Sequence, residues 1–336
     1  MPDGEGTDLY PTADSQGPGG AGPNEAISPG APQSGRGYVD AEFAGEEFNY
    51  QARSRARMVL RRFLRHRLAM LALCVFVAIL LLAVVGGHLW KYNYTAITND
   101  LAQGPSLRHP FGTDDIGHDL FAQVLHGAET SIETALLVSV VGTTIGVAVG
   151  AVAGYFGRFV DAALMRFTDL ILTIPILAVL IVLAHQIAKQ AGSWFWIGLL
   201  IAFLIWTYVA RLVRGAFLSL REREFVEASR AIGASSWRII TRHLIPNAVG
   251  PIIVNASLTV ATAVLLESTL SYLGLGVQPP NTSLGLLIAN GQTAAFTEPW
   301  LFYFPAIFIV VIVLCLNFIG DGLRDAFDPG QTRVRA

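Results

Sequence analysis

The densest group of residues with possible chemistry lies between positions 109 and 126, where histidines and carboxylates alternate. It comprises His109, His118 and His126 with Asp114, Asp115 and Asp119. Imidazole nitrogens and carboxylate oxygens are ligands for divalent metals, so the segment is a candidate metal site. Helix capping is the competing interpretation, because an aspartate oxygen readily accepts a hydrogen bond from the first turn of a helix. We favour capping and predict no metal site.

Two catalytic motifs are absent from the sequence. A P-loop for ATP reads G-x-x-x-x-G-K-[ST], and the only lysines, Lys91 and Lys189, do not follow a glycine. The zinc-protease motif H-E-x-x-H does not occur either. We therefore predict no catalytic residue and no cofactor bound by this chain.

An intramembrane aspartyl protease is the rival class of function. It needs two facing carboxylates within the membrane, one of them in a Gly-x-Gly-Asp context. Asp169 and Asp321 are the candidates, but Phe318 stands where the first glycine belongs. This alternative is weak.

Glu267 is the first ionisable residue after a long uncharged stretch. A carboxylate within an apolar span predicts a function, because burying a charge in lipid is expensive. With the polar neighbours Ser268 and Ser271 it is a candidate for lining a transport pathway near the outer interface. The alternative is a helix that simply ends among lipid headgroups.

A polar segment, residues 211–247, predicts a helix–turn–helix between two apolar stretches. The first helix has apolar residues at helical spacing, a glycine makes the turn, a serine caps the second helix, and a proline stops it. The residues concerned are Phe225, Ala228 and Ile232, then Gly233, Ser235 or Ser236, Trp237, Ile240, Leu244 and Pro246. The apolar face needs a partner, either lipid headgroups or another protein.

Glu227 and Gly233 have two interpretations each. Glu227 can pair with Arg223 or Arg230, which contributes only a few tenths of a kcal/mol, or contact a partner protein. Gly233 can end the first helix, or it can let a partner approach the backbone closely.

The composition places these elements in a membrane. Hydrophobic residues make up 53% of the 336 residues and charged residues only 14%. Apolar stretches of about 20 residues are long enough to cross a bilayer as helices. The predicted spans are Leu68–Gly87, Thr134–Phe156, Leu170–Ala184, Trp194–Ala210, Ile245–Leu266 and Trp300–Gly320.

The basic residues predict the orientation of the spans. If the chain crosses six times, 20 lysines and arginines fall on one side and only Lys91, Arg108 and Lys189 on the other. The positive-inside rule makes the first side cytoplasmic, with both termini on it.

The spans also predict the division of the chain. Residues 1–50 hold ten Gly, six Pro and nine acidic residues against one basic residue, a composition typical of disorder. We predict a disordered acidic cytoplasmic tail (1–52), a basic juxtamembrane segment (53–67), a transmembrane domain (68–320) and a cytoplasmic C-terminal tail (321–336). The long outer loops are residues 88–129 and 276–299.

The helix–turn–helix resembles the EAA loop of ATP-binding-cassette (ABC) importer permeases. Glu227-Ala228-Ser229, then Gly233, then Ile245-Pro246-Asn247 match its pattern, with Ser229 and Ile245 as small departures. In that family the loop is the coupling helix, which docks in a groove of the ATPase. The resemblance implies coupling roles for Glu227, Ala228, Ser229, Gly233 and Pro246.

Other motifs resemble the dipeptide/oligopeptide (and nickel) subfamily, in particular its C-type subunit. His109-Pro110-Phe111-Gly112-Thr113-Asp114 with Gly117 and Asp119 resembles its outer-loop signature, with His118 where the family has arginine. The match continues through 154–169, 271–280 and 320–329, and covers about residues 57–330.

The resemblance implies an all-α polytopic membrane protein of six transmembrane helices, in the type I (MetI-like) ABC importer permease fold. The chain would not be an enzyme but a permease subunit in the bacterial cell membrane, forming half of a pathway for dipeptides or oligopeptides. Its implied partners are a B-type permease subunit, two ATPases that bind ATP and magnesium, and an extracytoplasmic binding protein that delivers ligand to the outer loops. Nickel, glutathione or another small solute are alternative substrates; no nucleic acid is expected.

Overall fold

The structure is a computed structural model that describes residues 55–191 and 194–328. Within these residues the chain is helical and forms no extended strand, as predicted. The predicted acidic tail, residues 1–52, lies outside the described part. The helices are α1 (Arg55–Phe63), α2 (Arg67–Leu81), α3 (Gly87–Leu89), α4 (Leu120–Phe156), α5 (Arg158–Thr173), α6 (Ile176–Ala191), α7 (Trp194–Leu220), α8 (Glu224–Ala231), α9 (Ser236–Ile239), α10 (Ile245–Tyr272), α11 (Leu284–Gly291) and α12 (Trp300–Phe327).

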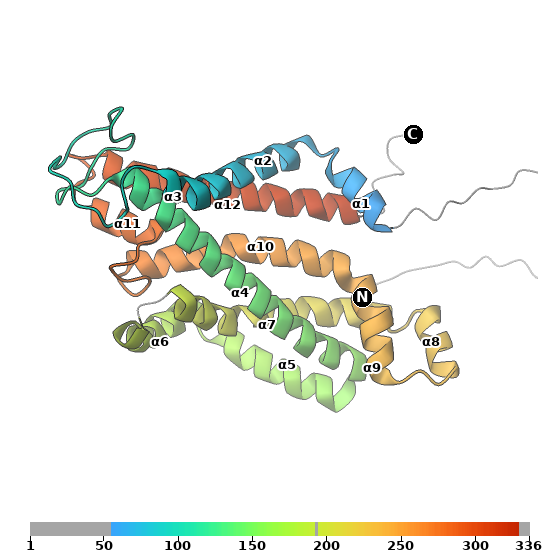
Figure 1. The fold of residues 1–336 in the computed structure, drawn as a ribbon. Coiled ribbons are helices and arrows are strands. Elements are labelled where there is room, and N and C mark those ends of the chain that lie inside the picture. The colour runs from blue at the N-terminus through green and yellow to red at the C-terminus, as the bar shows by residue number, and fades with distance from the viewer. Residues whose placement is uncertain (1–54, 192–193, 329–336) are drawn as a thin grey trace, which may run out of the picture. The chain divides into compact units, whose positions relative to one another are not determined.

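Five helical segments of the described residues are long and apolar enough to cross a membrane. They correspond to α2–α3, α4, α7, α9–α10 and α12, and the bent pair α5–α6 makes a sixth if it counts as one span. The helices lie lengthwise together, with the loop before α4 and helix α11 at one end and α1, α8 and α9 at the other (Figure 1). We call the first the outer-loop end and the second the coupling end, after the roles that the sequence predicts for them.

The third predicted span, Leu170–Ala184, does not form a single straight helix. Residues 170–184 are divided between α5 and α6, which meet at an angle of 80°. Pro175 has no N–H to donate and disfavours a helical backbone at Ile174, which is extended with φ −85° and ψ 132°. The apolar run thus continues through a sharp bend.

Several helices run beyond the predicted spans. Helix α4 begins at Leu120, α7 continues to Leu220, and α12 continues to Phe327 into the predicted C-terminal tail. The outer loop 276–299 contains the short helix α11. Hydropathy identifies only the apolar part of a helix that can lie in lipid, so it did not detect the more polar ends of these helices.

Helices α4 and α7 form the centre of the bundle, and glycines let them approach closely. Gly142, Gly146, Gly150 and Gly154 repeat every four residues and face α7. A Cβ at Gly146 would lie 2.5 Å from Cβ of Val209, and one at Gly154 would lie 2.6 Å from Cβ of Phe217. Such a row of small residues is a common way for membrane helices to pack.

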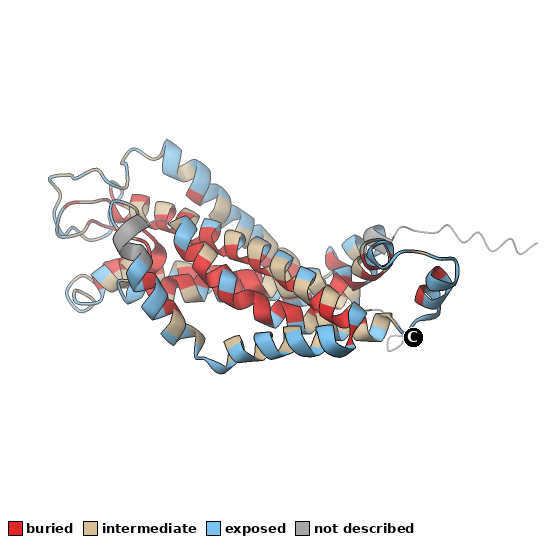
Figure 2. Cartoon of the chain, turned by 90° about the horizontal axis from the view of Figure 1, so that it is seen from below, coloured by how far each residue is buried: buried red, intermediate tan, exposed pale blue. Residues whose placement is uncertain are grey.

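The remaining helices pack around this centre. Helix α10 contacts both α4 and α12, and α12 contacts α2 and α11. Buried residues fill the middle of the bundle, and exposed residues follow the outer faces of the surrounding helices (Figure 2). Many of the exposed residues are large and apolar, including Leu71 on α2 and Phe167 and Leu170 on α5. An exposed apolar surface of this kind suits contact with lipid or with another membrane subunit.

Candidate functional site

The coupling end presents the predicted helix–turn–helix. Helix α8 ends before Gly233, whose φ of 78° is readily adopted by glycine. Ser235 then caps α9 by accepting a hydrogen bond from the backbone N–H of Arg238. The turn and the cap are confirmed at the residues that the sequence indicated.

One face of the helix–turn–helix is buried against the bundle and the other is bare. Val226 is fully buried and packs in one cluster with Phe217, Ile240 and Leu244. In contrast, Ile232 is 85% exposed and Trp237 is 69% exposed. The expectation that Ile240 and Leu244 belong to the outward apolar face is therefore wrong, because their helix continues inward and places them in the core.

Glu227, the residue expected to contact a partner, is exposed at this end. Among the described residues it forms no ion pair with Arg223 or Arg230. The guanidinium of Arg230 instead lies 5.6 Å from the ring centroid of Tyr155 on α4. The carboxylate of Glu227 therefore stays on the surface and does not stabilise the fold through an ion pair with either arginine.

Ala228 and Ser229 are consecutive residues of α8 that differ in burial. Ala228 is exposed, whereas Ser229 is buried and donates its hydroxyl to the carbonyl of Phe225 at 2.7 Å. A Cβ built on Gly233 would meet nothing within 4 Å, so the space beside this turn is open. The backbone of this turn is therefore exposed.

Pro246 does not stop the second helix, contrary to the prediction. The helix runs from Ser236 to Tyr272 without a break. A π-helical turn over Ile240–Leu244 widens it just before the proline, and the N–H of Ile245 bonds to the carbonyl of Ile240. The wider turn accommodates the missing N–H and the bulky ring, which would otherwise break the helix.

Two arginines of α7 join α5 to the bundle. Arg214 donates to both carboxylate oxygens of Asp161, with Nη2 2.6 Å from Oδ2, and Arg211 lies 2.5 Å from Asp169. Asp161 is a half-buried residue near the start of α5. Sequence reasoning counted these arginines for orientation only and missed the pairs.

Asp321 is exposed, so neither candidate carboxylate of the protease alternative belongs to a buried facing pair.

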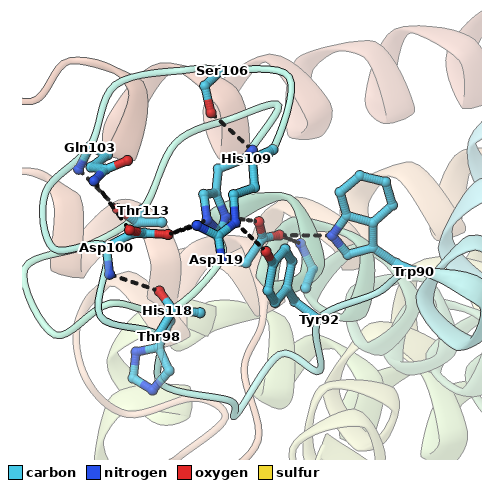
Figure 3. Close-up of polar contacts among 12 residues, drawn as sticks. Trp90, Tyr92, Thr98, Asp100, Gln103, Ser106, His109, Thr113, His118 and Asp119 are labelled. Atoms are coloured by element: carbon cyan, nitrogen blue, oxygen red, sulfur yellow. Dashed lines mark hydrogen bonds and ion pairs between the residues drawn. The ribbon is translucent and has the colours of Figure 1, made fainter.

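The outer-loop end is organised around the buried side chains of His109 and Asp119 (Figure 3). Their Nδ1 and Oδ2 atoms are 2.6 Å apart, and Nε2 of His109 lies 3.3 Å from Asp100. The other oxygen of Asp119 caps α4 through the N–H of Ala122 and accepts from the indole of Trp90. The predicted capping role of the aspartate is therefore confirmed, and His109 is its partner.

Asp114 shapes the turn that follows. Its Oδ1 accepts the backbone N–H groups of Ile116, Gly117 and His118, and its Oδ2 lies 2.8 Å from Nδ1 of His118. The histidine that replaces the family's arginine thus pairs with a carboxylate within the loop. No group of three or more His, Cys, Asp or Glu that could hold a metal occurs in the part of the chain described here.

The outer loop is also fixed to α12 and borders a cavity. The indole of Trp300 donates to the carbonyl of Thr113, and the ring of Phe111 stacks on Phe304 at 4.1 Å. A cavity of about 590 Å³ lies between this loop and residues 279–291. Its polar lining includes Asp115, Asn281 and Asn290.

Glu267 lies neither in an open pathway nor at a headgroup surface in this structure. Its side chain is fully buried and accepts hydroxyl hydrogen bonds from Ser131 on α4 at 2.8 Å and from Ser271 at 2.7 Å. The same two hydroxyls accept the backbone N–H groups of Leu284 and Val277. The carboxylate therefore joins α4 and α10 to the outer loop that carries α11.

Comparisons with known proteins show which family this chain belongs to. Residues 146–333 match the family described as binding-protein-dependent transport system inner membrane component, and residues 54–109 match the N-terminal transmembrane domain of oligopeptide transport permease C. The oligopeptide transport system permease protein OppC of Mycobacterium tuberculosis is 43% identical over 84% of this chain and 97% of its own length. OppC of Bacillus subtilis is 38% identical over 84% of this chain and 92% of its own.

A solved structure shares the fold. The permease chain in an inward-facing MetNI methionine ABC transporter superposes with a TM-score of 0.50 at 19% identity. The match covers 61% of this chain and 97% of that one. The expected type I importer permease fold is thereby confirmed.

Proposed function

This chain belongs to the family of inner membrane components of binding-protein-dependent transport systems and is a permease subunit of an ABC importer, and we propose that its substrates are peptides. The proposal is supported by the similarity over almost the whole length of relatives named as oligopeptide permeases. Nickel and glutathione remain the alternative cargoes. The subunit is not itself an enzyme.

The exposed surface of Glu227, Ile232, Gly233 and Trp237 is the surface that we propose for docking the ATPase. It lies at the coupling end, and its apolar side chains contact nothing within the described residues that would bury them. Helix α8 is held to α4 by the Arg230–Tyr155 contact and to α7 by Val226 and Phe217. A displacement of α8 by a partner would therefore be transmitted to the two central helices.

The outer-loop end suits the proposed binding protein. Its loop contains the His109–Asp119 pair, contacts α12 and borders a cavity open to solvent. The proposed cytoplasmic location of the opposite end follows from the charge count, because 20 of 23 basic residues fall on that side of the predicted spans. A B-type permease subunit would cover part of the exposed apolar surface of α5 and α6.

The coupling role is tested by Gly233→Leu in the reconstituted importer. Leucine would place a side chain into the open space of the docking turn and strain a backbone with φ of 78°. We expect the variant to assemble in the membrane but to lose ATP-driven uptake at least tenfold, with ATP hydrolysis no longer stimulated by ligand. Uptake and hydrolysis are measured together, with a labelled peptide mixture, nickel and glutathione as separate ligands.

Gly274→Leu is the matched control. Gly274 also has a positive φ, 74°, and a Cβ there would also meet nothing within 4 Å, but it follows α10 at the outer-loop end. It should keep ligand-stimulated hydrolysis. Coupled uptake at the wild-type rate by Gly233→Leu would contradict the docking surface. Uptake of nickel or glutathione but not of peptides by the wild-type importer would contradict the substrate class.

A further inference from the structure

Helix α1 and the residues that join it to α2 carry exposed arginines beside exposed apolar side chains. The exposed arginines of this segment are Arg57, Arg61, Arg65 and Arg67, and the exposed apolar residues are Met58, Leu60, Leu64 and Leu68. A short helix with basic and apolar residues side by side is typical of segments that lie at a membrane surface.

The fold holds α1 in one orientation. Phe63 is buried with Ala69 and Ala326, so one side of α1 packs on α12. Arg62 donates to the backbone carbonyl of Asp328 at 3.3 Å, and His66 lies 3.4 Å from the carboxylate of Asp325. These contacts leave the other arginines of the segment pointing away from the bundle.

The arginines lie where the chain enters the bilayer. Helix α1 ends at Phe63 and α2, the first apolar span, begins at Arg67. Leu68 and Leu71 near the start of α2 are exposed, as expected for side chains that face lipid. With α2 as the first membrane span, we expect the basic row at the depth of the headgroups.

The charges of this row are not neutralised within the described chain. Arg211, Arg214 and Arg221 at the same end each pair with a carboxylate. No such pair occurs for Arg57, Arg61, Arg65 or Arg67 among the residues that the structure describes. A row of unpaired guanidinium groups at headgroup depth suits an anionic partner.

We propose that residues 57–68 bind the headgroups of anionic phospholipids. Each guanidinium offers paired N–H donors that match two oxygens of a phosphate, and the apolar side chains lie along the acyl chains below. The partner is the lipid surface itself, and the binding does not depend on which solute the importer carries.

The test compares lipid retention by the full chain, purified in detergent with any subunits that remain attached. Native mass spectrometry measures the preference for phosphatidylglycerol over phosphatidylcholine. Each arginine near a membrane surface contributes about a fivefold preference, so Arg57→Gln with Arg61→Gln should lower it about 25-fold. The preference of the wild type should also fall as salt increases.

Two further variants make the result specific. Arg57→Lys with Arg61→Lys keeps both charges and should retain most of the preference. Arg223→Gln with Arg238→Gln removes the same charge from the residue before α8 and from α9, and should leave the preference unchanged. Elution of each variant at the wild-type position in size-exclusion chromatography shows that the fold is kept.

The proposal is overturned if the glutamine pair at positions 57 and 61 retains the wild-type preference, or if the control pair at 223 and 238 loses as much. It is also overturned if inorganic phosphate displaces the lipid at equal concentration, because that would indicate a site for free anions. Transport assays play no part in this measurement, so its outcome is separate from that of the proposed function.

Discussion

Glu267 shows how a charged residue is accommodated inside an apolar bundle. Three serine hydroxyls bind its carboxylate, from Ser131 on α4 and from Ser268 and Ser271 on α10. The sequence indicated that Glu267 was unusual and that serines lay nearby, but it could not show the burial. Ser131 lies 136 residues away, and the contact exists only because α4 packs against α10.

We expect Glu267→Ala to destabilise the protein by about 2 kcal/mol or more, because it leaves buried hydroxyls without an acceptor. Glu267→Gln keeps one acceptor oxygen and should cost less. Thermal unfolding in detergent, followed by tryptophan fluorescence, measures both. An alanine variant as stable as the wild type would show that the carboxylate does not hold these elements together.

His109 and Asp119 illustrate a partial success at the same scale. Capping by Asp119 was predictable, because aspartate before an apolar helix is a local pattern. The pairing with His109 was not, because the loop must fold back to bring the two side chains within 2.6 Å.

At the scale of elements, hydropathy located the spans well and their ends poorly. It marked the apolar cores of the five straight spans. It could not place the 80° bend between α5 and α6, although Pro175 was a visible signal. The sequence of α4 contains glycines at every fourth position. It does not specify that they pack against α7, because the sequence of one helix does not identify the helix that it contacts.

The α4–α7 contact predicts a strong effect at Gly146. A Cβ there would lie 2.5 Å from Val209 and 2.8 Å from the carbonyl of Trp206, so even alanine must push the helices apart. We expect Gly146→Ala to lower stability by about 1–3 kcal/mol, the usual cost of overpacking.

Gly215→Ala is the control for this prediction, because a Cβ at Gly215 on α7 would meet nothing within 4 Å. It should be neutral or slightly stabilising, since alanine favours a helix over glycine. Thermal unfolding of the two variants side by side measures the difference. Equal melting temperatures would mean that α4 and α7 do not rely on close contact.

For the whole molecule, the charge distribution predicts that the two ends face opposite sides of the membrane. Leu107 in the outer loop and Ile232 at the coupling end are both strongly exposed, at 105% and 85%. In a chain whose Cys74 and Cys315 are replaced by Ser and Ala, a membrane-impermeant thiol reagent should label Leu107→Cys in intact cells. Ile232→Cys should react only after permeabilisation, and labelling in the reverse order would contradict the orientation.

The length of α4 gives the two ends a mechanical relation. Its 37 residues form one unbroken helix of about 55 Å, nearly twice the thickness of a hydrocarbon core. It starts at the aspartate cap beneath the outer loop and ends at Phe156, next to Tyr155, whose ring lies against Arg230 of α8. A stiff rod of that length, pivoting about its middle by about 10°, swings each tip by about 5 Å in opposite directions. A movement of one end of α4 by about 5 Å would therefore appear at the other end as a movement of the same size in the opposite direction.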